Sequence, residues 1–234
     1  HFTNWESTFL FLTAYAFCGI YLVLRLPETK PADAYLASSL KTILIKYLDI
    51  CTSYRFMSYS IMWGMSTAMI YIFAAIGPIL AIHQLKASPL TFGLLNLWAY
   101  IGLILGNLYS RRLVKNLSAL MTALLGTLIA LAGSSYLILQ VFFNELSLFG
   151  LFSAIFILYS GLPLVYNNVT VLALKKTKDK AVAASLMAFL DMLVTVLVIM
   201  AASYLHYNLS VSLGLLLLVM CTANLILLLT NMTL

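Results

Sequence analysis

The chain has 234 residues, of which 63% are hydrophobic and 9% are charged, and its mean hydropathy is +1.04. Soluble domains carry about 25% charged residues, so this composition excludes an ordinary soluble protein. The net charge of +6 does not indicate a nucleic-acid partner, because the basic residues are dispersed over loops beside apolar stretches.

Apolar stretches fill most of the sequence, and each is about as long as the ~20 residues that cross a bilayer as a helix. Inside lipid the backbone must satisfy its own hydrogen bonds, so each stretch is expected to be helical. The seven expected spans are 5–25, 57–82, 90–110, 117–143, 146–174, 181–205 and 209–230. The sequence therefore predicts an all-α polytopic membrane protein surrounded by a lipid bilayer.

The connectors between these spans alternate in charge. The basic connectors are 26–56, 111–116 and 175–180, and the nearly neutral ones are 83–89, 144–145 and 206–208. Every Lys and Arg except Lys86 lies in or beside a basic connector. Because basic residues accumulate in cytoplasmic loops, we expect the N-terminus of this chain outside and its C-terminus in the cytoplasm.

The first basic connector has a pattern of its own. Pro27 and Pro31 end the first span, since proline lacks the amide that a helix interior needs. Apolar residues then recur at spacings of three and four: Leu36, Leu40, Ile43, Leu44, Tyr47 and Leu48, with Lys41, Lys46 and Asp49 largely on the other side. This is typical of an interfacial amphipathic helix. We expect a single span over 1–26, a cytoplasmic linker over 27–56 and a six-helix bundle over 57–234.

Asp191 is the only acidic residue deep inside an expected span. A carboxylate at the centre of a membrane helix costs ~2.5–3.5 kcal/mol on insertion scales, so it should point into the bundle or toward water. There it can carry a proton or attract a cationic substrate. The alternative is a neutral structural acid that hydrogen-bonds to a neighbouring helix.

The span 146–174 contains a polar stretch made of Gly161, Pro163, Tyr166, Asn167, Asn168 and Thr170. Side-chain amides at this depth must face protein or water. They either line a central cavity, with Pro163 as a flexible point, or join helices by hydrogen bonds. We expect Asn168 and Thr170 to face the bundle axis.

Three further features lie in the spans 57–82 and 90–110. Gly77 and Pro78 should bend their helix, either as a gate hinge or as a static kink. Trp98 would stack on an aromatic or cationic ligand, or else face lipid. Gly102 and Gly106 have the spacing that allows close helix packing.

No catalytic motif is present: the sequence has no H-E-x-x-H, G-x-S-x-G or Walker loop, so we expect no enzyme activity. The three cysteines, Cys18, Cys51 and Cys221, are far apart and show neither metal nor disulfide spacing. We expect no metal and no cofactor.

The connector after the span 90–110 reads Gly106-Asn107-Leu108-Tyr109-Ser110-Arg111-Arg112-Leu113-Val114-Lys115. It resembles the second-half copy of the loop motif of the major facilitator superfamily, carried here by Gly106, Arg111, Arg112 and Lys115. Within that superfamily the chain resembles the Bcr/CflA branch of drug:proton antiporters. The other matches are Trp5 with Phe9-Leu10, Leu26-Pro27-Glu28-Thr29, Gly77-Pro78, Ser88-Pro89 with Phe92-Gly93-Leu94-Leu95, Gly161-Leu162, Asn168-Val169-Thr170 and Ala184-Ser185-Leu186-Met187.

This resemblance implies two six-helix halves, of which the chain would hold the last span of the N-terminal half, the linker and the C-terminal half. The missing N-terminal half is then an expected partner, since a binding site near the midplane lies between the halves. The substrate and proton pathway would include Asp191, Asn168, Thr170, Tyr166, Asn167 and Trp98. The chain departs from the branch at Asp191, where a neutral residue such as Gln is more usual.

The implied function is proton-coupled efflux of drugs or other small molecules through a bacterial inner membrane. Two alternatives stay open: an exporter of one dedicated metabolite or siderophore, and a non-transporting membrane fragment or scaffold.

Overall fold

A computed structural model describes residues 5–27, 40–175, 177, 179–204 and 208–233, and in these residues the chain is helical without strands. The chain divides into two units, residues 1–40 and 41–234. Pro31 and Leu36 of the expected linker lie outside the described residues. In the first unit, α1 spans Trp5–Leu24, and the Arg25 guanidinium lies over the Tyr21 ring, 5.2 Å from its centroid.

The second unit contains all the other helices. They are α2 (Leu40–Cys51), α3 (Tyr54–Ile79) with the π-helical turn η2 (Leu80–Gln84), α4 (Pro89–Leu113), α5 (Ala119–Phe142), α6 (Leu148–Leu174), α7 (Lys180–Ser203) and α8 (Leu209–Thr233). In the described residues, seven helices are long and apolar enough to cross a membrane: α1, α3 with η2, and α4 to α8. The expected all-α polytopic fold is confirmed.

The helices of the second unit begin where capping side chains occur. Ser53, Ser88, Ser118, Ser147 and Asp179 precede α3, α4, α5, α6 and α7, and each side chain accepts a hydrogen bond from the backbone amide three residues later. Such caps satisfy amides that have no partner within the helix. They explain why α3 begins at Tyr54, slightly earlier than the expected residue 57.

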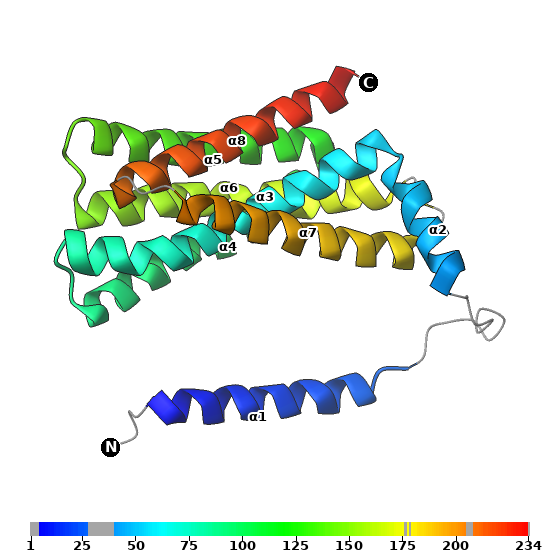
Figure 1. The fold of residues 1–234 in the computed structure, drawn as a ribbon, viewed down its shortest axis with the longest axis horizontal. Helices are drawn as coiled ribbons and strands as arrows, with labels where there is room; N and C mark the ends of the chain where they lie inside the picture. The colour runs from blue at the N-terminus through cyan, green and yellow to red at the C-terminus, as the bar shows by residue number, and fades with distance from the viewer. Residues whose placement is uncertain (1–4, 28–39, 176, 178, 205–207, 234) are drawn as a thin grey trace. The chain divides into compact units, whose positions relative to one another are not determined.

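Four helices form a closed ring in which α5 contacts α6, α6 contacts α3, α3 contacts α8, and α8 contacts α5. Helix α4 packs mainly on α6, and α7 mainly on α3. Figure 1 shows these helices running along a common direction, with α2 at the end of the bundle where α8 finishes. The two flanking helices, α4 and α7, are the least buried of the six.

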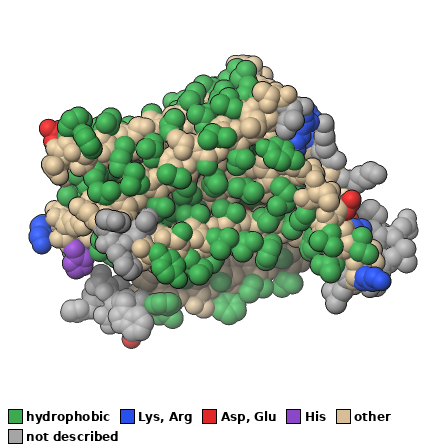
Figure 2. Space-filling view, turned by 45° about the horizontal axis from the view of Figure 1, so that its top comes forward, with side chains coloured by type: hydrophobic (Ala, Val, Ile, Leu, Met, Phe, Trp, Pro, Cys, Tyr) green, Lys and Arg blue, Asp and Glu red, His purple; other side chains and the backbone are tan. Residues whose placement is uncertain are grey.

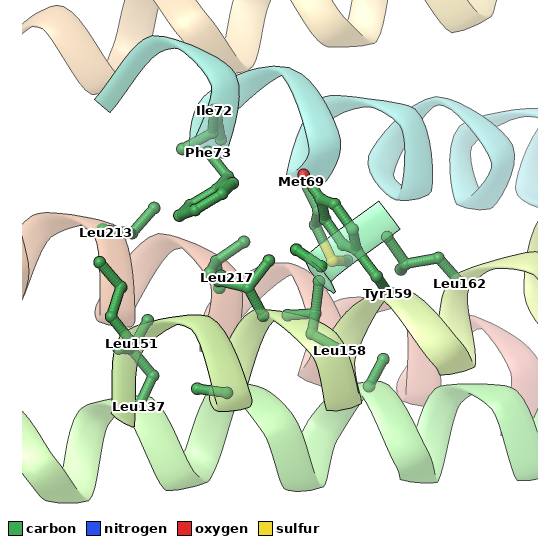
Figure 3. Close-up of a cluster of buried hydrophobic side chains, with 14 of the residues drawn as sticks. Met69, Ile72, Phe73, Leu137, Leu151, Leu158, Tyr159, Leu162, Leu213 and Leu217 are labelled. Carbon is green, nitrogen blue, oxygen red and sulfur yellow. The ribbon is translucent and has the colours of Figure 1, made fainter. Parts of the chain in front are cut away.

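The core of the ring is a continuous apolar cluster (Figure 3). Phe73 of α3 makes edge-to-face contacts with Phe152 and Tyr159 of α6, at centroid distances of 5.9 and 6.1 Å. The Tyr159 hydroxyl donates to the Ile70 carbonyl at 3.4 Å. Since lipid is as apolar as this core, association rests on such close packing and not on removal from water.

Glycines bring α6 close to two of its neighbours, to α4 at Gly102 and Gly106 and to α5 at Gly126 and Gly161. A Cβ added to Gly102 would lie 2.6 Å from the Phe156 carbonyl oxygen, and one added to Gly106 would meet the Ser160 carbonyl oxygen. The expected close packing at this pair of glycines is therefore confirmed. On the other side of α6, Gly161 faces Gly126 of α5 backbone to backbone.

Helix α2 packs on the bundle with a face that only partly overlaps the expected apolar side. The half-buried side chains are Ile43, Lys46, Tyr47, Ile50 and Cys51, whereas Leu44 and Leu48 are exposed. Lys46 lies on the bundle side because Asp179, directly before α7, accepts its hydrogen bond at 2.9 Å. Tyr47 also pairs with Ser185 of α7 at 2.9 Å.

Charge is segregated along the bundle, as Figure 2 shows: apolar side chains cover the middle and charged ones gather at the ends. The hydrogen bonds of Lys46 with Asp179 and of Tyr54 with Thr230 place α2, the start of α3, the start of α7 and the end of α8 together. The opposite turns meet through Gln84 and Asn208. Among the described residues of the second unit, the Lys and Arg residues other than Lys86 lie in segments at the α2 end, and Lys86 lies between η2 and α4 at the other end.

Candidate functional site

Asp191 lies midway along α7 and is 4% exposed. It faces α3 at Gly64, where an added Cβ would lie 3.3 Å from the Asp191 Cα and 2.8 Å from the Val194 Cβ. The missing side chain at Gly64 lets the two backbones approach. The carboxyl group is thereby placed against α3 instead of against lipid.

The carboxyl group of Asp191 keeps one free acceptor among polar neighbours. Thr67 of α3 is close enough to interact with it. The Oδ1 atom of Asp191 and the Oγ1 atom of Thr195, one helical turn later, are both buried without a partner among the described residues. A buried carboxyl oxygen without a donor is unfavourable unless the group is protonated or binds a cation. This arrangement is suited to taking up and releasing a proton.

A second polar group joins α4 to α6. Asn167 donates to the Asn107 Oδ1 atom at 2.9 Å, and the Asn107 amide donates to the Tyr166 hydroxyl at 3.2 Å. Asn168 is buried and donates to the Ser110 hydroxyl at 3.1 Å and to the Leu164 carbonyl at 2.8 Å. These amides therefore hold α4 against α6.

Thr170, one turn after Tyr166, is half-buried. Its hydroxyl donates to the Tyr166 carbonyl at 2.7 Å within the same helix. The polar stretch of α6 thus serves helix packing through Asn167 and Asn168. The Thr170 hydroxyl is instead satisfied by a backbone carbonyl of the same helix.

The two polar groups occupy different helix contacts, α3 with α7 and α4 with α6. No hydrogen bond between described residues links them. Asp191 lies midway along its helix, whereas Asn107 and Asn167 lie nearer the α2 end of theirs. The residues that the family resemblance assigns to one pathway therefore lie in two separate helix contacts of this chain.

Trp98 of α4 is stacked on Phe156 of α6, with ring centroids 4.8 Å apart and an angle of 14° between the planes. It is 45% exposed. One face of the indole is thus occupied by protein, and the other is free for lipid or for a flat ligand.

The three candidate hinge residues lie in different surroundings. Pro78 is the second-last residue of α3, and the π-helical turn η2 begins two residues after it at Leu80. Gly77 lies against the Phe73 ring. A π-turn after a proline is a local break in the regular hydrogen-bond pattern. Pro163, by contrast, is buried in unbroken α6, where its ring fills the space beside Gly106.

The glycine of the loop motif is buried between helices, and its basic residues lie on the protein surface. Gly106 is buried in the contact of α4 with α6, while Arg111, Arg112 and Lys115 are exposed. Arg111 and Arg112 lie in the last turn of α4, where positive charge is favourable next to the helix dipole.

Several buried or half-buried polar residues of the membrane helices were not predicted as site residues from the sequence. Asn107 and Ser110 are the α4 partners of the α6 amides, and Asn231 of α8 donates to the Ser58 hydroxyl at 2.8 Å. Asn224 of α8 is also buried. For the three asparagines, the sequence signal is the same as for Asn167: a side-chain amide in or next to an otherwise apolar stretch.

In the described part of the chain, no group of three or more His, Cys, Asp or Glu side chains is placed to hold a metal ion. Comparison of the sequence with models of protein families gives no match. Comparison with curated proteins gives none either.

Proposed function

We propose that this protein is a membrane transporter that moves small molecules in exchange for protons. Its six-helix bundle would be the C-terminal half of a transporter of the major facilitator type, in the drug:proton antiporter branch. The sequence matches described above support the family, and the buried acid of α7 supports the coupling to protons.

The observation that carries the proposal is Asp191, whose carboxyl group is buried midway along a membrane helix, with one oxygen that has no hydrogen-bond partner in the part of the chain that the structure describes. Intramembrane acids of this kind typically serve proton relays or cation pathways. Protonation neutralises the carboxyl group while α7 stays packed on α3, and proton release leaves a charge that attracts a cation. Each charge moved across the membrane is driven by ~2.3 kcal/mol per 100 mV.

The helix arrangement supports a two-half mechanism. The ring of α3, α5, α6 and α8 is closed, whereas α4 and α7 are flanking helices with large exposed surfaces. A second bundle packed on these flanking helices would leave Asp191, on the inner side of α7, near the midplane of the two-bundle transporter, where transporters of this kind bind substrate. Rocking of one bundle against the other then exposes the site to each side in turn. Pro78 and the following π-turn would supply a bend at the end opposite α2.

The charge segregation supports an orientation. The α2 end carries the basic connectors, so it faces the cytoplasm of a bacterial inner membrane, with the N-terminus of this chain outside and its C-terminus inside. A carboxylate in apolar surroundings favours substrates that are cationic and largely apolar.

The test uses the protein in the full length that its gene encodes, reconstituted in liposomes. We expect it to move a fluorescent lipophilic cation only when a pH gradient is present. Asp191→Asn keeps the shape and hydrogen bonding of the side chain but removes its titration, so it should abolish the pH dependence or the preference for cations.

Glu145→Gln is the matched control, because Glu145 is an exposed acid in the turn between α5 and α6. It should transport as the unsubstituted protein does. Absence of flux from folded protein would support the scaffold alternative, and unchanged flux, pH profile and selectivity in Asp191→Asn would leave this residue a structural acid.

A further inference from the structure

A cavity of about 630 Å³ lies beneath α2, at the basic end of the bundle. Its lining comes from four segments: Lys46, Asp49 and Ile50 of α2; Ser53, Arg55, Phe56 and Tyr59 at the start of α3; Leu172, Ala173 and Lys175 at the end of α6; and Thr177 and Asp179 before α7. Asp191 is not among these residues, so the cavity is separate from the site proposed above.

The lining has an apolar part and a charged part. Ile50, Phe56 and Leu172 contribute apolar surface, and Phe56 is buried in the hydrophobic cluster at this end of the bundle. The charged residues come from α2, the start of α3, the end of α6 and the connector before α7. A molecule that fills both parts of the cavity must itself be amphiphilic.

The charged part has an excess of positive groups. Lys46 and Asp179 neutralise each other in their 2.9 Å ion pair. Arg55 and Lys175 form no ion pair with any carboxylate in the described part of the chain, and Asp49 is the one remaining acid in the lining. Two cations therefore face one acid across the cavity, and an anion would be favoured there.

The exposed apolar face of helix α2 indicates how deep this cavity lies in the membrane. Its bundle side is held by Lys46 and Tyr47, while Leu44, Ile45 and Leu48 expose 59, 55 and 61% of their surface on the other side. An apolar face beside charged residues is typical of a helix lying at the membrane surface. The cavity then opens at the level of the lipid headgroups.

We propose that this cavity binds an anionic phosphate group through Arg55 and Lys175. The planar guanidinium of Arg55 is suited to two parallel hydrogen bonds to phosphate oxygens, and Lys175 adds a point charge. The apolar wall formed by Ile50, Phe56 and Leu172 favours a phosphate that carries an acyl chain, and basic pockets at the cytoplasmic ends of membrane helices bind such headgroups.

The test measures binding of phosphatidylglycerol to the purified protein in detergent by native mass spectrometry. The double substitution Arg55→Gln with Lys175→Gln should weaken the apparent affinity at least about tenfold, the effect of losing roughly one charge-assisted hydrogen bond. The control is Arg111→Gln with Arg112→Gln, which removes the same charge from exposed positions in the last turn of α4, and it should leave the affinity unchanged.

Two further arms complete the experiment. Leu172→Trp narrows the cavity at its apolar wall without altering its charge, and it should also weaken binding of the lipid, which covers the case in which the double substitution disturbs folding. Inorganic phosphate as competitor distinguishes a lipid headgroup from free phosphate as the natural ligand. If millimolar phosphate does not displace the lipid, the site is assigned to a headgroup. If it does displace the lipid, the site is assigned to free phosphate. Equal losses in both double substitutions, or full binding by Leu172→Trp, would overturn the proposal.

Discussion

Gly64 of α3 and Asp191 of α7 face each other across the contact between their helices, at a point where a Cβ on Gly64 would lie 3.3 Å from the Asp191 Cα. The burial of the acid therefore depends on a residue of another helix that has no side chain. The same added Cβ would lie 2.8 Å from the Val194 Cβ, which is closer than van der Waals contact allows.

The first prediction concerns this close approach. Gly64→Val should push α7 away from α3 and destabilise the bundle by about 1–3 kcal/mol, as overpacking does. It should also expose Asp191 to a hydrophobic carbodiimide that modifies carboxyl groups. The measurements are the midpoint of thermal unfolding in detergent and the rate of carbodiimide labelling.

Gly93→Val is the control for this prediction, since Gly93 of α4 is exposed and nothing lies within 4 Å of its added Cβ. Equal effects of the two substitutions would show that loss of a helical glycine, and not helix separation, is responsible.

The second prediction concerns the amide pair that joins α4 to α6. Asn167→Ala and Asn107→Ala should be coupled in a double-mutant cycle, because the Asn167 amide donates to the Asn107 Oδ1 atom at 2.9 Å. Interhelical hydrogen bonds in membranes contribute about 0.6 kcal/mol on average, so the expected coupling is of that size. The measurement is the free energy of reversible unfolding in mixed micelles. A coupling free energy of zero would contradict the bond.

The positions of the spans could be predicted from the sequence because they depend on local properties. Apolar length and capping residues suffice: the expected 146–174 corresponds to α6 at Leu148–Leu174, and Ser147 is its cap. The burial of Asp191 could likewise be anticipated, since a charge facing lipid is too unfavourable for a stable span.

The partners of buried groups could not be predicted in this way. The sequence position of a polar residue indicates its depth in a span but not which neighbouring helix it contacts. The pairing of Asn167 with Asn107 could therefore be identified only from the structure. The same holds for α2, where Lys46 was expected on the polar side. Its ion-pair partner Asp179 is 133 residues away in the sequence.

The third prediction concerns orientation. After replacement of Cys18, Cys51 and Cys221, single cysteines at Asn144 and Thr177 should behave differently in intact cells. A membrane-impermeant thiol reagent should label Asn144→Cys in the turn between α5 and α6, but not Thr177→Cys before α7, because the basic connectors are expected inside. Both should react once the cells are permeabilised. Labelling of position 177 alone in intact cells would reverse the topology.

The fourth prediction concerns the pH dependence of α2 docking. The hydrogen bond from Lys46, together with the Val182 amide, lowers the pKa of Asp179 below its usual value. A carboxyl group whose pKa is lower in the docked state stabilises docking at pH values above its free pKa of about 3.9, and this contribution is lost as the pH falls through the lowered value. Because both side chains of the pair are more than one-third exposed, the contribution should be small, about 0.2–1 kcal/mol.

A spin label at Leu44→Cys, on the exposed side of α2, reports this docking once the native cysteines are replaced. Its mobility should be constant from pH 7 to about pH 4.5 and rise below about pH 4. Asp179→Asn keeps a good helix cap but removes the charge, so the label should be more mobile at every pH and lose its pH response. Asp49→Asn, at an exposed acid of α2 without an ion pair among the described residues, should behave as the unsubstituted protein. A mobility that stays the same from pH 7 to pH 3 would mean that apolar packing of Ile43 and Ile50, and not the ion pair, holds α2 on the bundle.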